Sequence, residues 1–234
     1  MIRTLLALLL VLPLSVQGAT LRGGQGTAAA GVREGAEISI CYNYGCLRED
    51  VVRFKAGTLA RLGERLAAAR TAAEERELLA EAVGRLYRVA GTQTPVGADR
   101  AGNFLDAEVH GRMDCIDHST STTRLLELVE ARGWLRFHRV VEPARRTRFI
   151  LQHFSAVVEV LSAAERIARL PPGQALAGCN CTEDGQVIEE AAEGDGGDRP
   201  GERYVVDSWF VDNGEPAVVL PLAEWLKGGG PNVQ

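Results

Sequence analysis

The sequence has no excess of basic charge, and this absence excludes one class of partner. Its 26 lysines and arginines are outnumbered by 31 aspartates and glutamates, which gives a formal net charge of −5 at pH 7. A general nucleic-acid-binding protein needs surplus basic side chains to neutralise phosphates. We therefore expect that this protein does not bind nucleic acid.

Long apolar runs are also missing after residue 18. A membrane-spanning helix needs about 20 consecutive apolar residues, and no later stretch approaches that length. Aromatic residues make up only 6% of the chain, yet hydrophobic residues reach 46%, which is too many for intrinsic disorder. The 234 residues therefore predict one well-buried domain, with no stable membrane insertion once the N-terminal segment is removed.

The first 18 residues have the layout of a secretory signal peptide. Arg3 supplies a positive start, residues 5–14 form an almost unbroken apolar run, and Gly18 ends the segment with a small residue. An uncleaved membrane anchor is the alternative, but the apolar run is only about half as long as a spanning helix requires. We expect an exported protein that is periplasmic or secreted.

Cysteines are informative in an exported chain, because oxidising compartments pair thiols. Four of the five form two close pairs and one stands alone: Cys41 and Cys46, Cys179 and Cys181, and the single Cys115. Each pair could bridge internally, or the two pairs could bridge each other. The four could instead hold zinc, but spacings of four and one residues between the ligands are unusual for structural zinc. We favour disulfides, assign no metal, and expect one unpaired thiol.

The order of the periodic segments predicts an α+β fold, in which N-terminal helices are followed by an antiparallel sheet. Residues 19–35 predict a flexible segment, and a single domain follows over residues 36–234, with an acidic, glycine-rich insertion at about 179–203. The expected elements are an extended segment at 37–44, helices at 59–66, 71–91 and 114–132, and strands at 134–141, 149–160 and 203–211.

Local signals define two of these helices more closely. Thr71 and Glu74 match a capping box, in which each side chain bonds the backbone of the other residue. Asp114 is expected to cap the third helix, and Gly133 is suited to the position just after its end. With Asp114 as the cap, Cys115 becomes the first residue of that helix.

The position of Cys115 favours a reactive thiol. The helix dipole and the free backbone N–H groups of a helix N-terminus stabilise an anion, so we expect the pKa of this thiol to fall. The same N–H groups could stabilise the oxyanion of a tetrahedral intermediate. A thiol nucleophile also needs a base and a group that orients the base. His153, at the start of one predicted strand, and Asp207, inside the next, supply both residue types.

Cysteine at a helix N-terminus, histidine on one strand and aspartate on the neighbouring strand, in that order, resembles the transglutaminase-like cysteine-enzyme superfamily. The run Asp114-Cys115-Ile116-Asp117-His118 is similar to the D-C-x-D-[YH] motif of its bacterial transglutaminase-like cysteine proteinases. The resemblance covers residues 100–215, about half of the chain. It implies a transglutaminase-like, papain-like core.

The resemblance further implies a mechanism. Cys115 would be the nucleophile and His153 its base, with Asp207 fixing the imidazole tautomer, so that an acyl-enzyme forms on a protein or peptide substrate and is hydrolysed. Four neighbours are expected to support the site: Asp114, Asp117, His118 and Gln152. We expect no cofactor. Some relatives bind calcium with an acidic residue after the cysteine, where this chain has Ile116, which leaves Asp114 and Asp117 as the remaining ligands.

Several alternatives stay open at this stage. Cys115 could be an inert buried thiol, and Asp207 could cap a turn. His118 could act as the base, because it lies on the same helical face as Cys115. Taken as a block, Asp114, Cys115, Asp117 and His118 could bind a metal ion. For the whole protein, the alternatives to hydrolysis are acyl transfer to an amine and a non-catalytic binding role on the same fold.

Overall fold

The computed structural model describes residues 34–102, 105–169 and 198–231. The signal peptide at 1–18, nearly all of the segment at 19–35, both Cys179 and Cys181, and most of the acidic insertion at 179–203 lie outside the described residues. Within the described part the fold is mixed, with helices and antiparallel sheets, as the α+β prediction requires. None of its helices combines the length and the apolar character needed to cross a membrane.

Two antiparallel sheets enclose the central helix. The strands are β1 (Ala36–Tyr42) and β2 (Arg48–Phe54), which form a hairpin, and β3 (His138–Arg148), β4 (Leu151–Val160), β5 (Arg203–Asp207) and β6 (Val218–Pro221), which pair in that order. The helices are α1 (Ala56–Leu66), α2 (Ala72–Gly91), the 3₁₀ turn η2 (Pro95–Ala98), α3 (Cys115–Ala131), α4 (Ala163–Ala168) and α5 (Leu222–Leu226).

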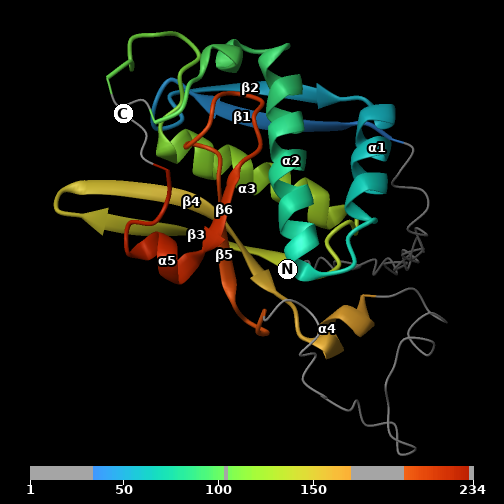
Figure 1. Ribbon diagram of the computed structural model, residues 1–234. Coiled ribbons are helices and arrows are strands. Elements are labelled where there is room, and N and C mark those ends of the chain that lie inside the picture. Colours follow the sequence, from blue (N-terminus) through green and yellow to red (C-terminus); the bar gives the residue numbers. More distant parts are fainter. Residues whose placement is uncertain (1–33, 103–104, 170–197, 232–234) are drawn as a thin grey trace, which may run out of the picture.

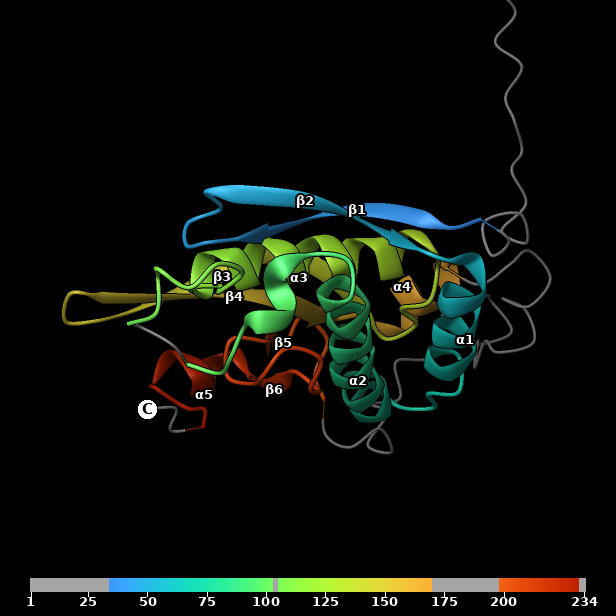
Figure 2. The same ribbon diagram turned by 90° about the horizontal axis from the view of Figure 1, so that it is seen from above.

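Helix α3 lies between the β1–β2 hairpin and the four-stranded sheet (Figure 2). Its buried face packs with both, so one hydrophobic core runs through the helix layer from Ile40 and Val52 of the hairpin to Ala156 and Val158 of β4. Helices α1 and α2 close one end of this arrangement. Because α3 is the middle layer, its first residue, Cys115, lies against strand β4.

The local signals predicted α3 correctly. It begins at Cys115 with Asp114 as its cap, and it is followed by Gly133, whose φ of 71° lies in the left-handed region that glycine tolerates best. For α2 only half of the predicted capping box forms. The Thr71 hydroxyl accepts the Glu74 N–H, but the Glu74 carboxylate accepts the N–H of Arg70 instead of that of Thr71.

The extended segment predicted at 37–44 is strand β1, but the prediction that the sheet strands all follow the helices was wrong, because β1 pairs with β2 in a hairpin ahead of α1. The predicted strand at 134–141 was misplaced, and β3 begins only at His138. The cause is Glu75, whose fully buried carboxylate accepts the backbone N–H groups of Arg136 and Phe137 and so removes them from strand pairing. A buried acid that organises a distant loop cannot be recognised from local sequence.

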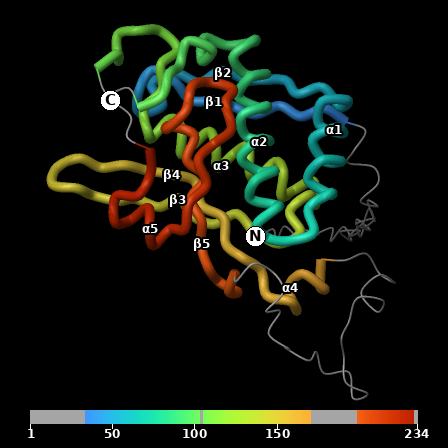
Figure 3. Tube along the Cα trace, in the orientation of Figure 1, coloured from blue at the N-terminus to red at the C-terminus, as the bar shows by residue number. Residues whose placement is uncertain are grey.

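The other two predicted strands are shortened at one end each. β4 begins at Leu151 and not at residue 149, because Phe149 and Ile150 form the turn of the β3–β4 hairpin, with a φ of 56° at Phe149. β5 ends at Asp207 and not at residue 211. The β3–β4 hairpin extends beyond the neighbouring elements (Figures 1 and 3).

Candidate functional site

The capping box around Cys115 is complete. One oxygen of Asp114 accepts the N–H groups of Ile116 and Asp117 at 3.0 and 2.9 Å, and Asp117 accepts the N–H of Asp114 at 3.2 Å. Asp114 and Asp117 thus act on the backbone of the helix start, and the Cys115 side chain remains available. The supporting position predicted for both acids agrees with this geometry.

A disulfide-closed loop holds the same two acids from the other side. Cys41 is bonded to Cys46, and the residues between them turn sharply, with positive φ at every position from 43 to 46. The backbone N–H groups of Tyr44 and Cys46 donate to Asp117 at 2.7 and 2.5 Å, and that of Gly45 donates to Asp114 at 3.0 Å. Successive N–H groups in such a turn form a binding site for a carboxylate.

Asp117 is therefore buried among backbone donors. Burial raises its pKa to about 6, while the N–H groups of Cys46, Asp114 and Tyr44 oppose this rise. The donors also bear on the calcium expectation, because all four carboxylate oxygens of Asp114 and Asp117 already accept backbone N–H groups. A cation at this position would compete with these donors for the carboxylates.

The cysteine pairing is now defined for three of the five residues. Cys41 and Cys46 bond to each other, so neither is bridged to Cys179 or Cys181, which the sequence left open. Their sulfurs lie near Glu49 in the one group of potential metal ligands in the described ranges, but as a disulfide they are not thiolate ligands. Cys115 is the free thiol, as expected.

We predict that removing this disulfide destabilises the protein. Closing a loop of this length stabilises a fold by about 2 kcal/mol in the chain-entropy account, so the C41A/C46A double variant should lose about that much free energy of unfolding in urea titration. C115A is the matched control, because it removes a cysteine that forms no disulfide. Equal stability of the wild-type chain with and without reductant would contradict the prediction.

His153 and Asp207 form the second half of the site, on adjacent strands. His153 Nε2 lies 2.7 Å from Asp207 Oδ2, and the His153 and Asp207 side chains are 12% and 1% exposed. Trp225 donates its indole N–H to the same oxygen at 2.9 Å, and the other oxygen accepts the backbone N–H of Trp209. Asp207 therefore pairs with His153 and also accepts a backbone N–H two residues further along the chain.

The imidazole of His153 is enclosed by aromatic rings. The ring centroids of Trp209, Phe210 and Trp225 lie 4.7, 5.4 and 5.4 Å from its own. Since Nε2 faces Asp207, and no described residue hydrogen-bonds Nδ1, Nδ1 is the nitrogen left to exchange a proton. The Asp207 carboxylate is placed to stabilise the imidazolium that such an exchange would create.

The thiol of Cys115 lies against β4 on both sides of His153. Its sulfur is 3.7 Å from the Gln152 carbonyl oxygen, and it also receives a backbone hydrogen bond from Phe154. The negative charge of Asp207 is close enough to act on the thiol. The structure thus brings Cys115, His153 and Asp207 to one place, and Gln152 contributes its backbone to that place.

The expected fall in the pKa of Cys115 does not occur. Burial raises the pKa of this thiol to about 11, and the charges of Asp114 and Asp207 add to the rise, while the Phe154 N–H opposes it. The helix N-terminus favours a thiolate, but loss of solvent and the acidic cap outweigh that effect. At neutral pH the thiol is therefore protonated unless a neighbouring base accepts its proton.

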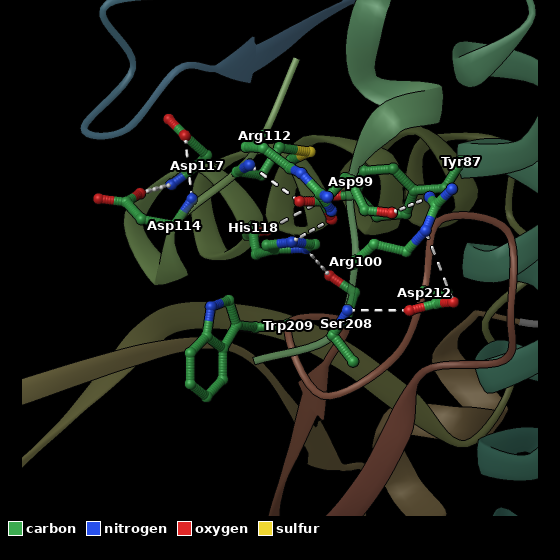
Figure 4. Close-up of polar contacts among 12 residues, drawn as sticks. Tyr87, Asp99, Arg100, Arg112, Asp114, Asp117, His118, Ser208, Trp209 and Asp212 are labelled. Carbon is green, nitrogen blue, oxygen red and sulfur yellow. Dashed lines mark hydrogen bonds and ion pairs between the residues drawn. The ribbon is translucent and has the colours of Figure 1, made fainter. Parts of the chain in front are cut away.

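His118 is not placed to be that base. Its ring is 4% exposed, with Nε2 at 2.9 Å from Asp99 and Nδ1 at 2.8 Å from the hydroxyl of Ser208, so both nitrogens are engaged (Figure 4). Thr122 bonds the same hydroxyl at 2.8 Å, and Tyr87 bonds Thr122 at 3.0 Å. The alternative metal site of Asp114, Cys115, Asp117 and His118 does not form either, because the His118 side chain points into this network.

The network connects helix α3, which begins at Cys115, to strand β5, which ends at Asp207. Ser208 directly follows Asp207, so a hydrogen bond from α3 to Ser208 holds the end of β5 relative to Cys115. Asp99, Ser208 and Trp225 were not among the predicted site residues. Only Asp99 carries a local signal, as an acid beside the apolar residues of η2, and nothing near Trp225 indicates that its indole reaches Asp207.

A cleft of about 390 Å³ opens at His153. Its walls come from the β3–β4 hairpin and from the segment after α5, and its lining residues are Arg146, Thr147, Arg148, Leu151, Gln152, His153, Trp209, Leu226, Lys227 and Gly228. A concave surface with apolar walls and a few polar groups is typical of a ligand site.

Comparisons with protein-family models, with curated proteins and with solved structures found no match.

Proposed function

We propose that this protein is an exported thiol hydrolase that cleaves peptide or amide bonds with Cys115, His153 and Asp207. The observation that carries the proposal is the 2.7 Å pair of His153 and Asp207 on adjacent strands, next to the free thiol at the start of α3. The Cys41–Cys46 disulfide is compatible with an oxidising compartment outside the cytoplasm.

The reaction would begin with proton transfer from the Cys115 sulfur to His153 Nδ1, with Asp207 stabilising the imidazolium. The thiolate then attacks the carbonyl carbon of the scissile amide. Of the first-turn N–H groups, those of Ile116 and Asp117 are bonded to Asp114, whereas that of Cys115 contacts only its own sulfur. The Cys115 N–H is therefore the donor that would stabilise the oxyanion.

The remaining steps use the same proton carrier. The imidazolium gives its proton to the leaving amine as the carbon–nitrogen bond breaks, which leaves a thioester on Cys115. His153 then takes a proton from a water molecule, whose oxygen attacks the thioester carbonyl. The carbon–sulfur bond breaks, the acid product leaves, and the proton on His153 returns to the sulfur.

Alkylation of Cys115 as a function of pH tests the pairing. In the wild-type protein, peptide mass spectrometry should show iodoacetamide labelling at neutral pH, because a thiolate–imidazolium pair supplies the thiolate. In H153A no imidazole accepts the proton of the thiol, whose pKa is raised by burial, so labelling should move to more alkaline pH. Because thiolate is the reactive form, labelling rises with pH in both proteins, and only the position of the rise differs.

Two further measurements make this result specific. The pH at which labelling of D207N rises should lie between the values for the wild type and H153A, because an amide stabilises the imidazolium less than a carboxylate does. Labelling in urea should be identical for all variants, which verifies that the differences come from the folded site. Superimposable pH profiles of wild type and H153A would contradict the enzyme proposal and favour a disulfide-stabilised binding protein.

A further inference from the structure

The cleft at His153 contains cations and no acid among its lining residues. Arg146, Arg148 and Lys227 contribute three positive charges, although the whole chain has a net charge of −5. Charges of one sign in a concave site with apolar walls reinforce one another and concentrate ligands of the opposite sign. The arrangement therefore selects for an anion.

Arg146 is occupied by the fold. Its guanidinium donates to the backbone carbonyls of Trp225 and Gly229 at 2.6 and 2.8 Å and stacks 4.6 Å from the centroid of the Trp225 ring. Burial lowers the pKa of Arg146, Asp207 opposes this change, and the nearby charge of Arg148 lowers it further. Arg146 therefore has a structural role: it connects β3 to the segment that forms the other wall of the cleft.

Arg148 and Lys227 are different, because neither side chain has a hydrogen-bond or ion-pair partner within the described ranges. They come from opposite walls of the cleft, one from β3 and the other from the segment after α5. By contrast, Arg139, also on β3, binds both Glu159 and Glu165. Two unneutralised cations that line one cleft are suited to an anionic ligand.

We propose that this cleft binds an acidic peptide segment, and that Arg148 and Lys227 recognise its carboxylate. Leu151 and Leu226 lie beside them and are 63% and 51% exposed, so an apolar neighbour of the acidic residue would find a contact on either wall. The inference rests on the proposed function in one respect, namely that this peptide is the substrate whose acyl group Cys115 accepts. It assigns the substrate class of the site.

Two sets of reactive peptides test the proposal. The probes are iodoacetyl tripeptide amides, which alkylate Cys115. One set carries a single glutamate at the first, second or third position, with leucine at the other two, and the second set carries glutamine in place of the glutamate. At low ionic strength, the best glutamate probe should react about fivefold faster than its glutamine counterpart, since partly exposed ion pairs contribute modestly. The ratio of the glutamate rate to the glutamine rate should fall toward one in R148S/K227S. It should also fall toward one in the wild type at high salt.

The ratio of the two rates cancels any change in the reactivity of the thiol. R145S is the matched control, because Arg145 lies on the same strand, is exposed, and does not line the cleft. It should retain the fivefold preference. A wild-type ratio of one, or a preference that survives in R148S/K227S, would overturn the proposal.

A second measurement separates this inference from the proposed function. If neither probe reacts at neutral pH, the thiol is not activated and the hydrolase proposal fails. Calorimetric titration with the corresponding acetylated peptides, which cannot alkylate, then tests the cleft alone. Tighter binding of the glutamate peptide, lost in R148S/K227S, would support an acidic ligand, and equal binding of both peptides would refute it.

Discussion

Replacing Cys115 by alanine should reduce amide hydrolysis at least about 10³-fold, because no other group of the site can form the acyl-enzyme. The residue is half-buried at the first position of α3, where alanine fits without disturbing the capping box. The measurement is cleavage of a denatured protein substrate, with the products followed by mass spectrometry. The thermal midpoint of the variant should stay within a few degrees of the wild type.

T123A is the matched control for C115A. Thr123 is on the same helix, and its hydroxyl only donates back to the Ser119 carbonyl, so its loss should leave hydrolysis unchanged. Hydrolysis that persists in C115A would show that another group or another protein performs the cleavage. A C115A variant that still binds acidic peptides in the cleft would be expected for either a hydrolase or a binding protein.

Replacing His118 by alanine should lower the free energy of unfolding by about 3 kcal/mol, because it leaves a buried carboxylate without its partner. Asp99 is fully buried, and in this variant it would keep only the N–H of Met113. Ser208 would lose a bond at the same time. Urea titration followed by circular dichroism measures the effect.

Two variants determine whether the loss comes from the Asp99 bond. H118Q can place its amide nitrogen near Asp99 and should recover part of the stability. H110A is the matched control, because His110 is exposed and its ring bonds the exposed side chain of Asn43 at 3.1 Å. A loss in H118A no larger than that in H110A would show that the buried network contributes little.

The parts of the site that the sequence predicted depend on local chemistry. Asp114 and Asp117 cap a helix from neighbouring positions, so their spacing alone defined the start of α3 and placed Cys115 at it. The order of Cys115, His153 and Asp207 could be proposed because each lies in a strongly periodic element. Their proximity in space was an expectation of family resemblance. In the structure His153 on β4 bonds Asp207 on β5, and the Cys115 sulfur lies 3.7 Å from the Gln152 carbonyl oxygen.

The parts that the sequence could not give depend on distant contacts. The bonds of Asp207 to Trp225 and of His118 to Asp99 join residues 18 and 19 positions apart through the packed fold, and no spacing rule covers them. The predicted fall in the pKa of Cys115 was wrong for the same reason. A helix N-terminus is visible in a sequence, whereas the burial that reverses its effect is not.

In the proposed mechanism, the ring of aromatic side chains around His153 limits where water can reach the thioester. Trp209, Phe210 and Trp225 surround the imidazole, whose side chain is 12% exposed and lines the cleft. Water for the proposed deacylation would therefore enter through the cleft that the leaving peptide has just vacated. An amine acceptor would use the same opening, so the choice between hydrolysis and cross-linking becomes a competition for one vacated position and is decided after the first product departs.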